Sequence, residues 1–204
     1  RYPLVTGVQT CALPIFTGDR MIYGHWPVAC KWSDDPHYHR VITQSPDGRV
    51  KVNNNMICNK DMYEHTYRRN LNSCSVALGG FLGATTSDLG SQCATPEMID
   101  KFVEAVAEIC LNYRIPVSNF MSHGEAADNV DQGPNPPYDT PYEAYGPMST
   151  WERWDLHVWI DPTSHQIVPP LGKKIPHNYV YFPDWVRGQA IQRIEDQTEK
   201  YWKV

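Results

Sequence analysis

Residues 95–123 read TPEMIDKFVEAVAEICLNYRIPVSNFMSH, and this stretch decides the fold. Thr95 followed by Pro96 is a typical helix start, because a threonine side chain caps the first turn and proline is tolerated at the first helical position. Apolar side chains then recur at helical spacing, at Met98, Ile99, Phe102, Val103, Val106, Ile109 and Cys110. The pattern predicts an amphipathic helix over residues 96–113 that packs on a sheet.

Short apolar segments on both sides of this helix are typical of buried strands. Residues 20–26 (RMIYGHW) and 75–78 (SVAL) each predict one. Residues 115–123 (IPVSNFMSH) predict a short strand or extended segment after the helix. His25 and His123 therefore lie at the ends of two of these segments, in a protein of the α/β class.

A hairpin is expected between the first strand and residue 75. Residues 39–43 (HRVIT) and 49–52 (RVKV) are β-branched runs, and the turn sequence SPDG separates them. Pro, Asp and Gly are the residues that tight turns favour, so the pattern predicts two paired strands.

The C-terminal third is less regular. Residues 128–150 are rich in Pro, Gly, Asn, Asp and Tyr and predict a long irregular loop, which in a compact domain is usually functional or mobile. Residues 151–160 again indicate regular structure, and a Pro-rich connection follows over 162–183. Asp184 is expected to cap a terminal helix, whose docking stripe would consist of Trp185, Ile191, Ile194 and Tyr201.

Length and charge bound the class of protein. With 204 residues, 41% of them hydrophobic, the chain can bury one substantial core, which favours a single domain. The net charge of -5 offers no basic stripe for a phosphate backbone, which argues against nucleic acid as a partner. No stretch approaches the roughly 20 consecutive apolar residues of a membrane-spanning helix, so membrane insertion is not expected.

Residues 1–16 (RYPLVTGVQTCALPIF) differ from the rest of the chain. Their central part resembles the translated read-through of a sequencing adapter, as in a metagenomic reading frame, so we exclude this non-native segment from the fold. A signal peptide lost with the native N-terminus would leave no trace here. The remaining cysteines are Cys30, Cys58, Cys74, Cys93 and Cys110. They form no CxxC pair and are odd in number, which argues against a disulfide framework and against a zinc ribbon. Most are expected to be buried as small hydrophobic residues.

The two strand-end histidines are candidate metal ligands. A catalytic zinc ion is held by a few imidazole, carboxylate or thiolate groups and keeps one position open for water. Asp155 supplies a carboxylate in a stretch bracketed by tryptophans, and Asp128 and Asp131 remain alternatives. Each residue alone is weak support for a metal site, because a single histidine beside an apolar strand is more often structural.

Several short motifs, in order along residues 20–160, carry a family resemblance. They are His25 to Val28 (HWPV), His37 to Ile42 (HYHRVI), Glu64 to Thr66 (EHT), Asn72 to Leu78 (NSCSVAL), Ser122 to Glu125 (SHGE) and Arg153 to Asp155 (RWD). Together they resemble the zinc-dependent N-acetylmuramoyl-L-alanine amidases of the type 2 family, which includes phage endolysins and shares its fold with the peptidoglycan-recognition proteins. The resemblance implies a central mixed β-sheet flanked by helices, with a catalytic domain over 17–163. Residues 164–204 form a C-terminal extension that is too short for a typical separate binding domain, so its terminal helix is expected to pack on the catalytic domain, and a wall-targeting element is the alternative.

The resemblance implies one zinc ion held by His25, His123 and Asp155, with Arg153 and Tyr38 as catalytic residues. Arg153 stands where the family often has lysine, and it keeps the charge with a planar set of donors. The chain departs from the family pattern at two places. Pro27 stands where a small hydroxyl residue is usual. A strand glutamate that other members have is missing, because the corresponding strand offers only Ala77, Leu78 and the glycines after them.

Three further residues are expected near the site. His39 is expected to support the site or to pack, because a fourth protein ligand would leave zinc no position for water. His65 resembles a histidine that contacts substrate, and its alternative is an exposed loop residue. Glu125 would either orient His123 or be solvated.

The resemblance implies a hydrolase that cleaves the amide bond between N-acetylmuramic acid and L-alanine in peptidoglycan. Such a protein would act on the cell wall as a phage-encoded or secreted monomer and would bind glycan and stem peptide. The alternatives are a peptidoglycan-binding module without activity and a structural or attachment component of a phage particle.

Overall fold

The computed structural model describes residues 21–26, 37–55, 66, 70, 73–84, 87–128, 156–169 and 174–202. Predictions that concern residues 1–16, His65, Arg153 and Asp155, and almost all of the 128–150 loop, lie outside the described residues.

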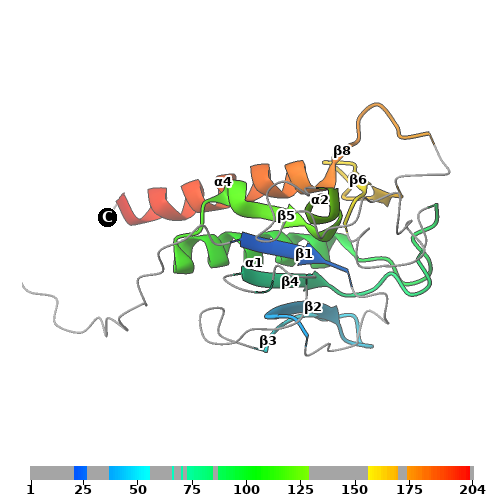
Figure 1. The fold of residues 1–204 in the computed structure, drawn as a ribbon, viewed down its shortest axis with the longest axis horizontal. Coiled ribbons are helices and arrows are strands. Elements are labelled where there is room, and N and C mark those ends of the chain that lie inside the picture. The colour runs from blue at the N-terminus through cyan, green and yellow to red at the C-terminus, as the bar shows by residue number, and fades with distance from the viewer. Residues whose placement is uncertain are drawn as a thin grey trace, which may run out of the picture.

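A five-stranded sheet forms the centre of the molecule, with strand order β3-β2-β4-β1-β5 (Figure 1). Its strands are β1 (Met21–His25), β2 (Arg40–Gln44), β3 (Val50–Asn54), β4 (Ser73–Leu78) and β5 (Phe120–Ser122). Strands β2 and β3 pair antiparallel, whereas β2 with β4, β4 with β1 and β1 with β5 pair parallel. The predicted mixed sheet flanked by helices is confirmed.

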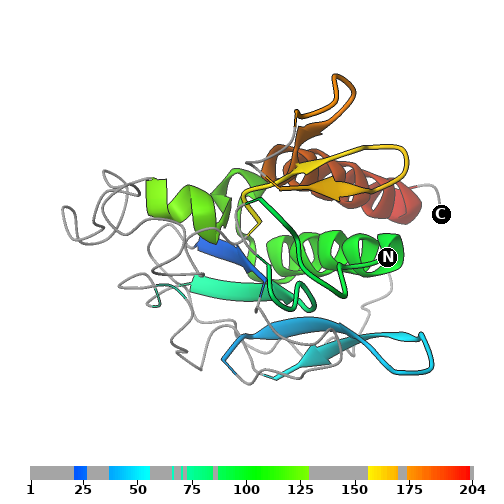
Figure 2. The same cartoon turned by 90° about the vertical axis from the view of Figure 1, so that its right-hand side faces the viewer.

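The predicted helix is α1 (Pro96–Tyr113), and its bounds match the sequence pattern. The backbone N–H of Met98 donates to the side chain of Thr95, which is the predicted cap, at 3.3 Å. The helix ends at Arg114, whose backbone is left-handed with φ of 54°. Figure 2 shows α1 along one face of the sheet, where it packs on β2 and β4.

The predicted hairpin is also confirmed, as β2 and β3. Its turn closes through the backbone N–H of Ser45, which donates to the carbonyl of Arg49 at 2.8 Å. Gly48 has φ of +90°, a conformation that glycine adopts without strain, so the PDG sequence accounts for the turn.

A second, three-stranded sheet of order β7-β6-β8 was not predicted from the sequence. It consists of β6 (Trp159–Ile160), β7 (Ile167–Val168) and β8 (Val180–Tyr181), so the 162–183 connection contains two of its strands. Strands of two residues are too short to show the alternation by which strands are recognised.

The terminal helix α4 (Phe182–Trp202) lies beside α1, as Figures 1 and 2 both show. It begins two residues before Asp184, which therefore lies in the first turn, and the prediction of Asp184 as the cap is wrong. The predicted stripe is correct in part, because Trp185 is buried and Ile194 packs on the core, but Ile191 is 47% exposed. The helix instead buries Phe182, Val186 and Ala190, which share one face at i, i+4 spacing.

The main core lies between α1, α4 and the sheet. Phe102 of α1 is completely buried and contacts Phe120 of β5 and Phe182 of α4, with ring centres 6.1 Å apart in each pair. Cys74 and Cys110 are buried, as expected for most of the cysteines, whereas Cys93 is exposed. Among the described helices, none is long and apolar enough to cross a membrane.

Candidate functional site

The two faces of the sheet differ in character, because successive side chains of a strand point to opposite sides. On the face toward α1, Ile22 and Val76 belong to the apolar core. On the other face, Tyr23 lies beside Ser75, and His25 follows two residues later. This second face carries the polar side chains of the candidate site.

His25 and His123 lie side by side where two neighbouring parallel strands, β1 and β5, end. His25 is the last residue of β1, and His123 directly follows β5. The ring centres are 4.7 Å apart and the planes are inclined by 68°. Both rings are buried, with 0% and 4% exposure.

This pair fits a metal ion of the zinc type. At the usual Zn–N distance of about 2.0–2.1 Å and tetrahedral angles, two zinc-bound imidazoles have ring centres about 5 Å apart. The observed separation of 4.7 Å between His25 and His123 is close to that value. Within the described ranges no group of three or more His, Cys, Asp or Glu side chains is arranged to hold a metal, so the described residues offer two candidate ligands and no third.

Tyr38 lies against His25, with ring centres 4.9 Å apart and planes inclined by 43°. The segment before β2 is held by Asn55, the residue after β3. The side-chain amide of Asn55 donates to the carbonyl of Tyr38 at 3.3 Å, and its backbone N–H donates to the carbonyl of His39 at 3.1 Å. The hairpin therefore fixes the backbone that presents Tyr38 to the site.

His39 is held by Ser75 across the sheet. The backbone N–H of Ser75 donates to Nδ1 of His39 at 3.1 Å, and the backbone N–H of His39 donates to Oγ of Ser75, also at 3.1 Å. Because Nδ1 accepts a hydrogen bond, neutral His39 carries its hydrogen on Nε2. The ring thus links β2 to β4 through an atom that is not open to a metal.

Thr66 contacts His25 and was not singled out by sequence reasoning. Its hydroxyl lies 3.3 Å from Nε2 of His25. Its backbone N–H donates to the side-chain oxygen of Asn70 at 2.8 Å, so a neighbouring residue orients it. A contact between residues 41 positions apart leaves no periodic signal in the sequence.

Glu125 is not a solvated carboxylate. The backbone N–H of Ser122 donates to its Oε2 at 2.9 Å, and its own backbone N–H donates to Oγ of Ser122 at 3.0 Å. These reciprocal bonds form a capping box at the start of α2 (His123–Asp128). The sequence pattern Ser-x-x-Glu of residues 122–125 carried this signal.

Glu125 also binds Arg187 of α4. The guanidinium donates to both carboxylate oxygens, at 2.8 and 3.1 Å. It also donates to Asp184 at 2.6 Å. Burial of Arg187 opposes its charge, but the hydrogen bonds that it donates to the carboxylates of Glu125 and Asp184 outweigh that effect and raise the pKa of the guanidinium.

Leu156 connects the chain after Asp155 to the end of β1. It is completely buried and has φ of 60°. A Cβ placed on Gly24 would lie 3.0 Å from the side chain of Leu156. Gly24 directly precedes His25, so the residue that follows Asp155 in the sequence packs on the core face of β1, next to the position before the first histidine of the pair.

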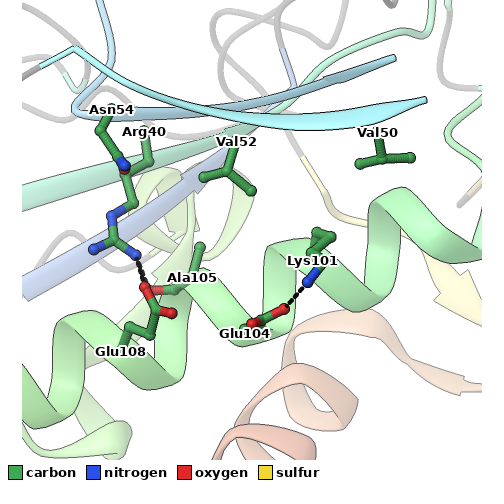
Figure 3. Close-up of a pocket in the computed structure, with 8 residues that line it drawn as sticks. All are labelled: Arg40, Val50, Val52, Asn54, Lys101, Glu104, Ala105 and Glu108. Atoms are coloured by element: carbon green, nitrogen blue, oxygen red, sulfur yellow. Dashed lines mark hydrogen bonds and ion pairs between the residues drawn. The ribbon is translucent and has the colours of Figure 1, made fainter. Parts of the chain in front are cut away.

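A pocket of about 210 Å³ lies elsewhere, between the β2–β3 hairpin and α1 (Figure 3). Its charged side chains form two ion pairs, Arg40 with Glu108 at 2.6 Å and Lys101 with Glu104 at 2.5 Å. Its lining includes none of the residues predicted for the functional site.

No family model and no curated protein sequence matches this chain. Among solved structures, the chain is similar to the N-acetylmuramyl-L-alanine amidase AmiD from E. coli, in complex with the substrate anhydro-N-acetylmuramic acid-L-Ala-D-gamma-Glu-L-Lys. The identity is 16% and the TM-score 0.40, over 62% of this chain. The match spans 55% of the AmiD chain, or about half its length.

Proposed function

We propose that the protein is a zinc-dependent hydrolase that cleaves the amide bond between N-acetylmuramic acid and L-alanine in peptidoglycan. The observation that carries this proposal is the buried pair of His25 and His123, whose ring centres lie 4.7 Å apart at the ends of neighbouring parallel strands. Two imidazoles at this spacing match a zinc centre, and the motifs around them occur in the order typical of type 2 amidases.

Asp155 is the proposed third ligand. The contact between Leu156 and Gly24 supports this choice over Asp128 and Asp131, because Leu156 directly follows Asp155 in sequence and Gly24 directly precedes His25. Bound zinc would lower the pKa of a water molecule toward neutrality and polarise the scissile carbonyl.

The side chains around the histidines would prepare the site for this chemistry. If the Thr66 hydroxyl accepts the hydrogen on Nε2 of His25, the lone pair of that imidazole lies on Nδ1, toward the metal. Tyr38, whose ring lies against His25, would donate a hydrogen bond to the carbonyl oxygen as negative charge develops on it. Arg153 would supply a positive charge for the same oxygen.

The proposed substrate is the glycan strand with its stem peptide. The protein would act on the cell wall as a monomer, either phage-encoded or secreted. His65 would contact the substrate, while His39 and Glu125 would support the site from outside the metal's ligand shell.

Product analysis on purified peptidoglycan tests this function. Mass spectrometry is expected to detect stem peptides with a free N-terminal L-alanine, together with glycan whose muramic acid carboxyl groups are free. Removal of zinc with a chelator should stop their release, and added zinc should restore it. Zinc-loaded protein that releases no such peptides would overturn the proposal, and binding to peptidoglycan without cleavage would favour a recognition module.

Replacing Thr66 by valine is expected to lower zinc affinity about 10–100-fold, as is usual when a hydrogen-bond partner of a metal-bound histidine is lost. Valine keeps the branched shape but removes the hydroxyl that lies 3.3 Å from Nε2 of His25. Competition with a chromogenic chelator measures the affinity. The matched Thr66→Ser variant keeps the hydroxyl and should stay near wild type, and equal affinity of the valine and serine variants would show that the contact has no role in zinc binding.

A further inference from the structure

Arg187 joins three separate parts of the molecule. It belongs to α4, beyond the boundary at residue 163 expected for the catalytic domain. Its guanidinium donates to both oxygens of Glu125, to Asp184 in its own helix, and to the backbone carbonyl of Phe120 in β5 at 2.9 Å. The guanidinium and the Glu125 carboxylate are both largely shielded from water, with 23% and 19% side-chain exposure.

These contacts surround His123 in the sequence. Phe120 lies three residues before it, and Glu125 lies two residues after it. Ser122, directly before it, exchanges two hydrogen bonds with Glu125. One guanidinium therefore binds the backbone before His123, at the Phe120 carbonyl, and the side chain of Glu125 after it. The planar set of donors of arginine suits such multiple contacts.

We propose that Arg187 is a positioning residue that holds His123 in the orientation required for metal binding. This inference rests on the proposed zinc site. The positioning role makes the terminal helix part of the functional unit. Arg187 holds Glu125 by a bidentate contact, and Glu125 lies in the first turn of α2, whose first residue is His123.

A second arginine of α4 provides a matched control. Arg193 forms an ion pair with Asp100 of α1, and its side chain is 30% exposed, similar to that of Arg187. Its ion pair also joins α4 to the rest of the protein, but its partner belongs to α1 and not to β5 or α2. A merely structural role would make both arginines equally important for zinc binding.

Zinc affinity of the full-length chain tests the proposal. Arg187→Gln is expected to lower the affinity about 10–100-fold, within the range known for residues that orient metal ligands, and to shift the absorption bands of the cobalt-substituted protein. Arg193→Gln should change the affinity less than about twofold, because no ligand depends on it. Urea unfolding of both variants measures how far each is destabilised.

Arg187→Lys offers a variant that keeps the charge and loses the fork, and we expect it to bind zinc more weakly than wild type and more tightly than Arg187→Gln. If Arg187→Gln bound zinc as tightly as Arg193→Gln, the positioning role would be overturned and the proposed function would stand. If wild-type protein bound no zinc, the proposed function would fail, and the positioning role with it.

Discussion

Replacing His123 by alanine is expected to remove zinc binding and to reduce release of L-alanine-terminated peptides at least about 1,000-fold. The proposed metal contributes several kcal/mol of transition-state stabilisation, and each 1.4 kcal/mol corresponds to about a tenfold change in rate. His123 is 4% exposed and its ring lies 4.7 Å from that of His25, so its replacement removes one of the two imidazoles of the buried pair. His25→Ala should have the same effect.

His177→Ala is the matched control for this experiment. His177 is exposed, lies in the connection before β8, and is not among the proposed ligands. Its replacement should leave both the zinc content and the rate within about twofold of wild type, because exposed surface substitutions are usually neutral. A His25→Ala or His123→Ala protein that kept full lytic activity and bound zinc would show that these histidines do not hold the metal.

Replacing Phe102 by alanine is expected to lower the free energy of unfolding by about 3–5 kcal/mol, the usual cost of removing a buried phenylalanine. The ring is completely buried and bridges Phe120 of the central sheet and Phe182 of the terminal helix. Its loss would leave a cavity where the sheet, α1 and α4 meet, because close-packed neighbours relax only in part. Urea denaturation followed by circular dichroism measures the change.

The comparison variant is Leu111→Ala in the same helix. Leu111 is 36% exposed, so its truncation removes less buried surface than that of Phe102 and should lower the free energy of unfolding less, by about 1 kcal/mol. A Phe102→Ala protein no less stable than Leu111→Ala would contradict the account of the core.

Local sequence signals predicted the regular elements well. The bounds of α1 followed from Thr95, Pro96 and the apolar spacing, because a cap and an amphipathic stripe act within a few residues of each other. The β2–β3 hairpin followed in the same way from its Pro-Asp-Gly turn. The second sheet was missed because its strands are two residues long and depend on pairing across the fold.

The approach of His25 to His123 was predictable in outline, because each histidine comes at the end of a predicted strand and the ends of parallel strands meet at one edge of a sheet. The residues that hold the two histidines in place could not be predicted. Thr66 reaches His25 across 41 positions, and Arg187 reaches Glu125 across 62. Contacts of this kind depend on how the elements pack. The Ser-x-x-Glu capping signal was the one local sign that Glu125 had a structural partner.

The central claim, that His25 and His123 hold a catalytic zinc ion, is tested most directly by X-ray absorption spectroscopy of the zinc-loaded protein. We expect a shell of nitrogen and oxygen ligands at about 2.0–2.1 Å with the outer-shell scattering of two imidazoles, and we expect this two-imidazole signal to disappear in His123→Ala, which should no longer hold zinc at the site. A shell dominated by sulfur at about 2.3 Å, or a His123→Ala spectrum identical to that of wild type, would contradict the account.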